Sequence, residues 1–402
     1  ANIRLASTDA ARYQTFTNPL GDAGQSLQKI RDQVPFGRLV VPFLRTPVNV
    51  AKYAMQRTPL APLMPTFRAD MVAGGARKDL ALARLALGST TMAITAGMAQ
   101  QGYITGNGPV NYDARRILEM SGWKPNSILL GDTYYSISRL DPIGNVLMMS
   151  ANVTEIIGQA SDEAEALDIA TAATISVANS LTSKTWFRGF SEFLEAYASA
   201  SADPENKQNV VIKWLERMGA SAIPAGVAAY TRTQDSTIRL TDGLVDKVKA
   251  RLPNYSKDLP PRRNMFGEPI VLEGGLGPDM MSPIYQSKKK NNAVVDEMIN
   301  NKVDIGMPRF TMDGIELSTI QYDRYVLLSA GEKMPMSLES QLSKLIKSNM
   351  YKQGASGKDG SKAFMIESYI SDYRSAAKQQ LLEEFPALKA EIIGEKIEGQ
   401  EA

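Results

Sequence analysis

An uncharged stretch of chain constrains the fold more than any other feature of this sequence: no residue from Leu85 to Tyr112 carries a charge. It follows the helix-breaking pair Gly74-Gly75, so we expect a helix to begin near Ala76 and to end near Gln101. The uncharged part of that helix would span roughly 25 Å at 1.5 Å per residue. This length is slightly less than the hydrocarbon core of a bilayer, which is about 30 Å thick.

Two interpretations of this helix remain open. Small residues such as Gly88 and Gly97 allow close approach to another helix in water or in lipid. Because serine, threonine and glutamine side chains make the segment polar for a transmembrane helix, a buried core helix is favoured over a segment that meets a membrane. The apolar residues expected to serve packing or membrane contact are Leu85, Leu87, Met92, Ile94 and Met98.

The absence of histidine and cysteine from the 402 residues narrows the chemistry open to the chain. Serine or cysteine nucleophiles activated by histidine, zinc sites, histidine-ligated haem and cysteine-ligated clusters all need one of these residues. Catalysis would have to rest on Asp, Glu, Lys, Tyr or Ser, with or without a divalent ion held by oxygens. For carboxylates with such an ion, the turn-like candidates are Asp132, Asp141, Asp304 and Asp313. Their spacing sets no ligand geometry, so we expect no catalytic residue, no metal site and no cofactor.

The remaining patterns predict a mainly α-helical chain. With 44% hydrophobic and 22% charged residues and a net charge of +2, the composition is that of an ordinary globular protein with no global attraction to nucleic acid. We expect a polar helical segment over residues 1–34 and a helical domain over 35–250. A loop-rich module with short strands, one of them the β-like run Val303–Ile305, would follow at 251–320. C-terminal helices are expected at 321–402, including one over Leu338–Tyr351 and an amphipathic helix from Lys362 to Glu384. The last stretch after Pro386 should either fray or join a coiled-coil-like contact.

Within the helical domain, a repeated tripeptide and three further periodic segments indicate helices. Arg45-Thr46-Pro47 places threonine and proline where helices begin, so a short helix should run from Val48 to Gln56, and Arg57-Thr58-Pro59 should end it. Further helices are expected over Ser161–Ser183, Trp186–Ala200 and Asp203–Met218. The glycine-rich run Gly274–Pro278 lacks the lysine and hydroxyl residue of a phosphate loop, so we expect no nucleotide there.

Basic and aromatic residues supply the remaining candidates for binding. For Arg262, Arg263, Lys288, Lys289 and Lys290, solvated loop charge is the favoured interpretation, and contact with a phosphate backbone or a partner is the alternative. For Arg45 and Arg57, two short punctuated helices are favoured over an arginine-lined binding surface. Aromatic side chains near the uncharged helix are expected at a membrane or protein interface; they are Tyr103, Tyr112, Trp123, Tyr134 and Tyr135.

Four motifs in order carry a resemblance over about Pro35 to Ile156. They are Val41-Pro42-Phe43-Leu44-Arg45-Thr46-Pro47 with Arg57-Thr58-Pro59; Gly74-Gly75 leading into Asp79-Leu80-Ala81-Leu82-Ala83-Arg84; the small-residue helix ending in Gly102-Tyr103-Ile104-Thr105-Gly106; and Gly122-Trp123-Lys124-Pro125-Asn126-Ser127-Ile128 with Tyr134-Tyr135 and Arg139-Leu140-Asp141-Pro142. In this order the segment resembles the large internal virion proteins of short-tailed bacteriophages, including the large polyvalent proteins.

The resemblance implies a structural protein that is packaged inside the capsid and ejected at infection. Such a protein would assemble with copies of itself, as a ring, into a conduit for the genome across the host periplasm and inner membrane. Its expected partners are other core, portal or tail proteins, the host inner membrane and phage DNA through non-specific contact. In that family this region lies towards the C-terminal side of a longer polypeptide, so we expect the chain to be a fragment. A portal- or tail-associated role without a membrane step is the alternative.

Overall fold

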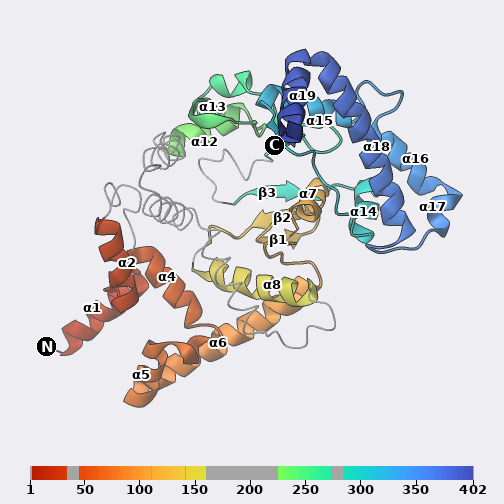
Figure 1. Cartoon of the computed structure of the whole chain (residues 1–402). Coiled ribbons are helices and arrows are strands. Elements are labelled where there is room, and N and C mark those ends of the chain that lie inside the picture. Colours follow the sequence, from red (N-terminus) through yellow and green to blue (C-terminus); the bar gives the residue numbers. More distant parts are fainter. Residues whose placement is uncertain are drawn as a thin grey trace. The chain divides into compact units, whose positions relative to one another are not determined.

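The computed structural model is mainly helical, with two small sheets, which confirms the fold class predicted from the sequence (Figure 1). It describes residues 2–33, 45–109, 111–140, 142–159, 225–272 and 284–401. The helices expected over Ser161–Ser183, Trp186–Ala200 and Asp203–Met218 lie outside these residues, as do the Gly274–Pro278 run and Asp141.

The chain divides into two compact units, and segments of the two units alternate along the sequence. The first unit comprises Ala1–Gly108, Pro125–Leu130 and Ser136–Trp214. The second unit comprises Pro109–Lys124, Gly131–Tyr135 and Leu215–Ala402.

The first unit is a group of helices in which the long helix α6 packs against α5 and α8. Its helix α4 begins at the first Arg-Thr-Pro tripeptide, close to the predicted start, and α5 begins with Pro65, whose missing N–H is not needed at a helix start. The described elements are α1 (Asn2–Gln14), α2 (Asp22–Gln33), α4 (Arg45–Met55), η1 (Ala61–Leu63), α5 (Pro65–Ala73), α6 (Gly75–Gln100), β1 (Ser127–Leu130) and α8 (Ile143–Gln159).

Small residues bring α6 close to its neighbours. Ala81, Gly88 and Thr95 are its buried residues, and their seven-residue spacing places them along one side of the helix. A Cβ atom at Gly88 would overlap the backbone carbonyl of Arg57, so the chain after α4 approaches α6 directly over this glycine. On α8, the Ser150 hydroxyl donates to the Met92 carbonyl of α6 at 2.6 Å.

A carboxylate on α8 holds the loop that follows α6. The Glu155 carboxylate accepts the Gly106 and Gly108 N–H groups at 2.7 and 2.8 Å, and the Asn152 side chain accepts the Asn107 N–H at 2.5 Å. Charge-assisted hydrogen bonds of this kind are stronger than neutral ones. The loop is therefore fixed onto α8.

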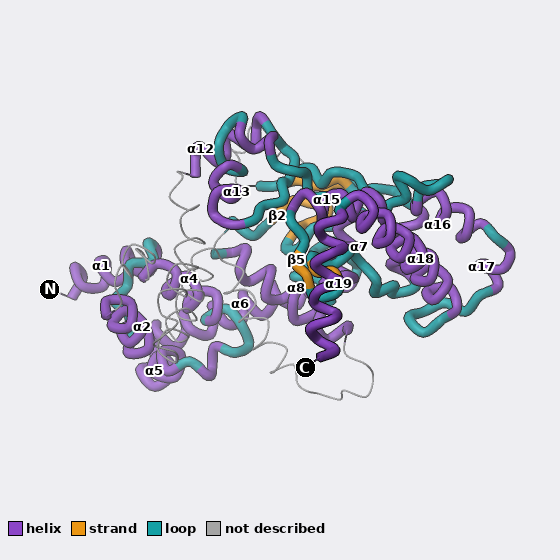
Figure 2. Tube along the Cα trace, turned by 45° about the horizontal axis from the view of Figure 1, so that its top comes forward, coloured by secondary structure: helices purple, strands orange, loops and turns teal. Residues whose placement is uncertain are grey.

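The second unit joins short strands and loops to a set of C-terminal helices (Figure 2). Its elements are α7 (Tyr112–Met120), β2 (Thr133–Ser136, whose last residue belongs to the first unit), α12 (Ala225–Gln234), α13 (Gly243–Lys249), η3 (Tyr255–Asp258), β3 (Gln286–Lys288), α14 (Ala293–Asn300), β4 (Thr311–Met312), β5 (Ile315–Glu316), α15 (Thr319–Ser329), α16 (Leu338–Lys347), α17 (Asn349–Gln353), α18 (Ser361–Glu384) and α19 (Pro386–Glu401).

The two sheets are antiparallel and small. In the first, β2 pairs with β3, and Tyr134 lies opposite Ser287. In the second, β4 and β5 form a hairpin whose turn residues Asp313 and Gly314 have φ angles of 48° and 94°. Positive φ at both positions is the geometry that two-residue hairpin turns require.

The core of the second unit lies where the C-terminal helices pack on α7 and α14. One cluster centres on Met298, Leu342 and Ile366, each 0% exposed. A second cluster includes Leu328 and Leu381 with residues of α19. These clusters bury the apolar faces that the sequence periodicity indicates.

The structure corrects the sequence interpretation at three places. The module at 251–320 contains a helix, α14, which the Asn292 side chain caps by accepting two backbone N–H groups, and the predicted β-like run from Val303 to Ile305 is not a strand. Of the two outcomes expected after Pro386, the structure contradicts fraying, because the stretch forms α19 and buries Leu388 and Ile392 against α15 and α18. The helix expected up to Tyr351 breaks at Ser348, which caps the short helix α17.

Candidate functional site: the exposed apolar face of helix α6

Helix α6 combines a charged first part with an uncharged second part. Arg77, Lys78, Asp79 and Arg84 lie in its first ten residues, and no charge follows up to its end at Gln100. Its 26 residues are long and apolar enough to cross a membrane by length and composition, and 17% of the most apolar window is buried. It is the candidate that the described part of the chain offers for contact with lipid.

The large apolar side chains of α6 point outward. Leu80, Leu87, Ile94 and Met98 are 51%, 70%, 62% and 37% exposed, and their spacing places them on one side of the helix. We call these four residues the α6 face. Leu85 and Met92 are half-buried and pack on small core clusters.

The favoured sequence interpretation, a buried core helix, is therefore wrong for most of α6. The side that packs against the neighbouring helices carries Ala81, Gly88 and Thr95, whose small size permits close approach. The large residues Leu87 and Ile94 remain mostly exposed on another side of the helix. Apolar residues in one continuous row on a surface are typical of interaction sites.

The five aromatic candidates divide into exposed and buried residues. Tyr103 and Tyr112 are 49% and 55% exposed, and Tyr103 lies three residues after the end of α6. Trp123 and Tyr134 are 8% and 7% exposed, and burial raises the pKa of Tyr134. The interface prediction is thus wrong for Trp123 and Tyr134, because their rings are core side chains, and Tyr135 beside them is half-buried.

Two of the basic residues considered for contact with a phosphate backbone form bonds within the protein instead. The Arg263 guanidinium pairs with Asp323 at 2.7 Å and donates to the Gly267 carbonyl. Arg57 donates to the Tyr53 carbonyl and the Tyr13 hydroxyl at 3.0 and 3.1 Å. Both guanidinium groups are held by the protein itself, so neither is displayed for a phosphate backbone.

Four of the other basic candidates are exposed, at the end of β3, just after it, and at the start of α4. Lys288, Lys289 and Lys290 are exposed, and their backbone is held because the Lys289 and Lys290 N–H groups donate to the Asp132 and Ser121 carbonyls. Gly122 has a φ of 83°, and a Cβ there would overlap the Lys288 carbonyl, so this approach requires glycine. Arg45 is also exposed.

A cluster of arginines and tyrosines in the second unit was not identified from the sequence. Arg262 donates to the Tyr112 hydroxyl at 3.0 Å, and the Arg116 guanidinium lies 4.8 Å from the centre of the Tyr112 ring. Burial raises the pKa of Tyr322 to about 12 and lowers that of Arg374. No local sequence signal joins these residues, since they come from α7, α15, α18 and a loop.

The carboxylates considered for metal-assisted catalysis do not come together. Asp304 pairs with Lys358 at 3.0 Å, and Asp313 pairs with Lys378 at 2.6 Å. Asp132 is exposed on the loop between β1 and β2. In the described ranges, no three acidic side chains are grouped closely enough to hold a metal ion.

Comparison with known proteins assigns neither a family nor a function to this chain. The sequence matches no protein-family model and no curated protein, and the fold matches no solved structure. The α6 face and its surroundings are therefore interpreted from their own chemistry.

Proposed function

We propose that this chain is a non-enzymatic structural protein of a bacteriophage virion, ejected at infection and assembled with copies of itself into a conduit for the genome. In this proposal the α6 face is the surface that meets the host inner membrane. The ordered motifs between Pro35 and Ile156 support the phage origin. The exposure of Leu87 and Ile94 on an uncharged helix supports the membrane step.

The physical case for lipid rests on the distribution of polarity along α6. Burying a leucine or isoleucine side chain that was exposed to water is favourable by about 1.5–3 kcal/mol. No charged group on the second part of α6 opposes that transfer. Arg77 and Lys78 at the other end lie where headgroup phosphates would attract them, and the exposed Tyr103 suits the interface between lipid and water.

Vesicle binding by a charge-neutral double variant tests the membrane step. Replacing Leu87 and Ile94 together by glutamine removes the apolar side chains from the α6 face without adding charge. Because both residues are largely exposed, we expect the variant to keep its fold and to bind phosphatidylethanolamine–phosphatidylglycerol vesicles about tenfold or more weakly. Co-sedimentation over a range of lipid concentrations measures this change.

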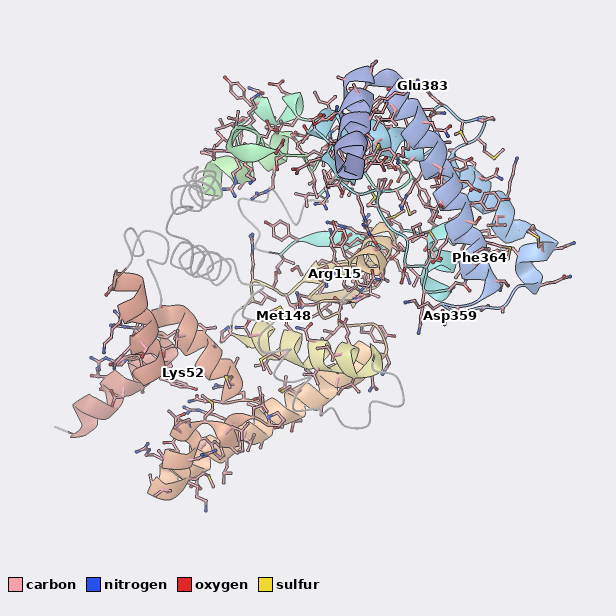
Figure 3. The ribbon with its side chains drawn as sticks, viewed as in Figure 1. Lys52, Arg115, Met148, Asp359, Phe364 and Glu383 are labelled. Atoms are coloured by element: carbon pink, nitrogen blue, oxygen red, sulfur yellow. The ribbon has the colours of Figure 1, made fainter. Side chains whose placement is uncertain are left out.

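A matched double variant elsewhere controls for general loss of surface hydrophobicity. Met350 and Phe364 are 65% and 72% exposed on α17 and α18, and Phe364 is labelled in Figure 3. Replacing both by glutamine should leave vesicle binding unchanged. A wild-type chain that ignores vesicles, or an α6 variant that binds them as the wild type does, would overturn the membrane step and favour a portal- or tail-associated role.

A further inference from the structure

The first unit contains a cavity of about 1030 Å³ between its helices α1, α4, α5 and α6. Three arginines line it: Arg57 just after α4, and Arg77 and Arg84 on α6. Asp9 and Asp70 are the acidic residues of the lining. Positive charge is therefore in excess by one in the cavity.

The three arginines differ in how their charge is compensated. Arg77 forms an ion pair with Asp70 at 2.6 Å, whereas Asp9 lies 3.9 Å from Arg12 on its own helix. Arg57 is held by hydrogen bonds to the Tyr53 carbonyl and the Tyr13 hydroxyl. Within the described part of the chain, neither Arg57 nor Arg84 has a carboxylate within ion-pairing distance.

Within the described part of the chain, Arg84 is the cavity arginine whose guanidinium keeps all of its N–H donors available. Its guanidinium carbon lies 4.3 Å from the centre of the Tyr13 ring, and its side chain is half-buried. Among the described residues, none accepts a hydrogen bond from its guanidinium group. A guanidinium has five N–H donors in a planar fork, which matches the oxygen atoms of a phosphate group.

Aromatic rings form the wall beside these cations. The Tyr13 and Tyr53 ring centres are 5.8 Å apart, and Phe16 meets Tyr53 edge-on at 5.4 Å. The Tyr13 hydroxyl donates to the Gln56 side chain at 2.8 Å, which fixes the ring. The wall therefore offers a firm surface for the carbon part of a ligand next to a fork of donors for its anionic part.

We propose that this cavity binds an organic phosphate, whose phosphate group pairs with Arg84 and whose carbon portion packs on Tyr13, Phe16 and Leu80. The chemistry fits a soluble phosphate ester and also the headgroup of an anionic lipid. Leu80 belongs both to the lining and to the α6 face, so the cavity opens beside the surface proposed to meet the membrane. The inference does not require the membrane step, because it rests on the unpaired arginine and the cavity.

Calorimetric titration of the full chain tests the proposal with defined ligands. The titrants are inorganic phosphate, glycerol 3-phosphate, adenosine 5′-monophosphate, and phosphatidylcholine vesicles with and without phosphatidic acid. We expect at least one organic phosphate to bind more tightly than inorganic phosphate. Arg84→Gln should weaken that binding about tenfold or more, since it removes a charge-assisted hydrogen-bonding group.

Two further variants make the result specific to the site. Arg84→Lys keeps the charge but loses the planar fork, so its affinity should fall between those of the wild type and Arg84→Gln. Lys344→Gln removes a positive charge from an exposed position on α16, outside the cavity, and should leave affinity unchanged. Circular dichroism of each variant confirms that the fold is retained.

The outcomes separate the two ligand sources. Binding of a soluble ester that depends on Arg84 assigns the cavity to a soluble phosphate, whereas Arg84-dependent binding to phosphatidic acid vesicles alone assigns it to a lipid headgroup. Binding of none of these probes, or equal binding by wild type and Arg84→Gln, overturns the proposal. The double glutamine variant at Leu87 and Ile94 should retain ester binding, so failure of the membrane step is distinguishable from failure of this site.

Discussion

At the scale of single residues, the Glu384 carboxylate on α18 is held by ion pairs within the protein. Its oxygens accept hydrogen bonds from Arg324 at 2.6 and 2.8 Å and lie 2.5 Å from the Lys333 ammonium group. The hydrogen bonds from Arg324 and Lys333 lower the pKa of Glu384 from 4.5 to about 2. The ionised carboxylate therefore stabilises the folded state.

The pH dependence of unfolding tests this role of Glu384. Because its pKa is lower in the folded chain, its contribution is fully present above about pH 4.5 and is lost as the pH falls towards about 2. Wild type should exceed Glu384→Gln in stability at pH 7 by something on the order of 1 kcal/mol, given that the pair is near the surface. That advantage should shrink between pH 4.5 and 2 in urea unfolding.

The neighbouring carboxylate provides the control. Glu383 is exposed on the same helix and is labelled in Figure 3. As the pH falls from 4.5 to 2, the free energy of unfolding of Glu383→Gln should change by the same amount as that of the wild type. Equal pH dependence of the wild type and Glu384→Gln would contradict the assignment.

At the scale of elements, one side of α6 packs against neighbouring segments and another side is exposed. Gly88 permits close approach of the chain at Arg57, whereas a Cβ at Gly97 would meet nothing within 4 Å. The same kind of substitution should therefore have opposite effects at two positions of one helix.

Alanine substitution at the two glycines tests this difference. Gly88→Ala places a methyl group against the Arg57 carbonyl and should lower the free energy of unfolding by about 1–3 kcal/mol. Gly97→Ala should raise it by about 0.5–1 kcal/mol, since alanine loses less backbone entropy in a helix. Urea unfolding followed by circular dichroism measures both changes, and effects of the same sign would show that α6 does not pack at Gly88 in this way.

At the scale of the whole molecule, the two compact units have separate cores. Met148 of α8, labelled in Figure 3, is 1% exposed in a core cluster of the first unit, and Ile366 of α18 is 0% exposed in one of the second. Burial in each cluster is local to its unit. Stability should then be lost unit by unit rather than through the whole chain at once.

Hydrogen exchange with core variants tests this expectation. Ile366→Ala should destabilise its surroundings by about 2–5 kcal/mol through lost contacts and a residual cavity. Peptides of α16 and α18 should exchange faster, while those of α6 and α8 keep wild-type rates. Met148→Ala should give the reverse pattern. Uniformly faster exchange in both units from either variant would show a single cooperative core.

Local signals in the sequence determined much of the helical framework. The proline and glycine punctuation places α4 and α6 within a few residues of their observed starts, and the apolar period of Lys362–Glu384 matches α18. Capping side chains and periodicity act over one or two turns, so they can be identified without tertiary information. The short helix α14 carries the same kind of signal, a capping Asn292 followed by apolar residues. Its eight residues span only about two turns, so their apolar period is too short to distinguish a helix from a loop.

Tertiary packing alone decided which side chains are displayed. The same sequence period is compatible with a buried or an exposed α6, and only the approach of its neighbours over Ala81, Gly88 and Thr95 leaves Leu87 and Ile94 exposed. It likewise buries Trp123 and places Arg84 beside Tyr13, residues far apart in the sequence. Helix formation depends on near neighbours in the chain, whereas exposure and the grouping of charges depend on contacts between distant segments.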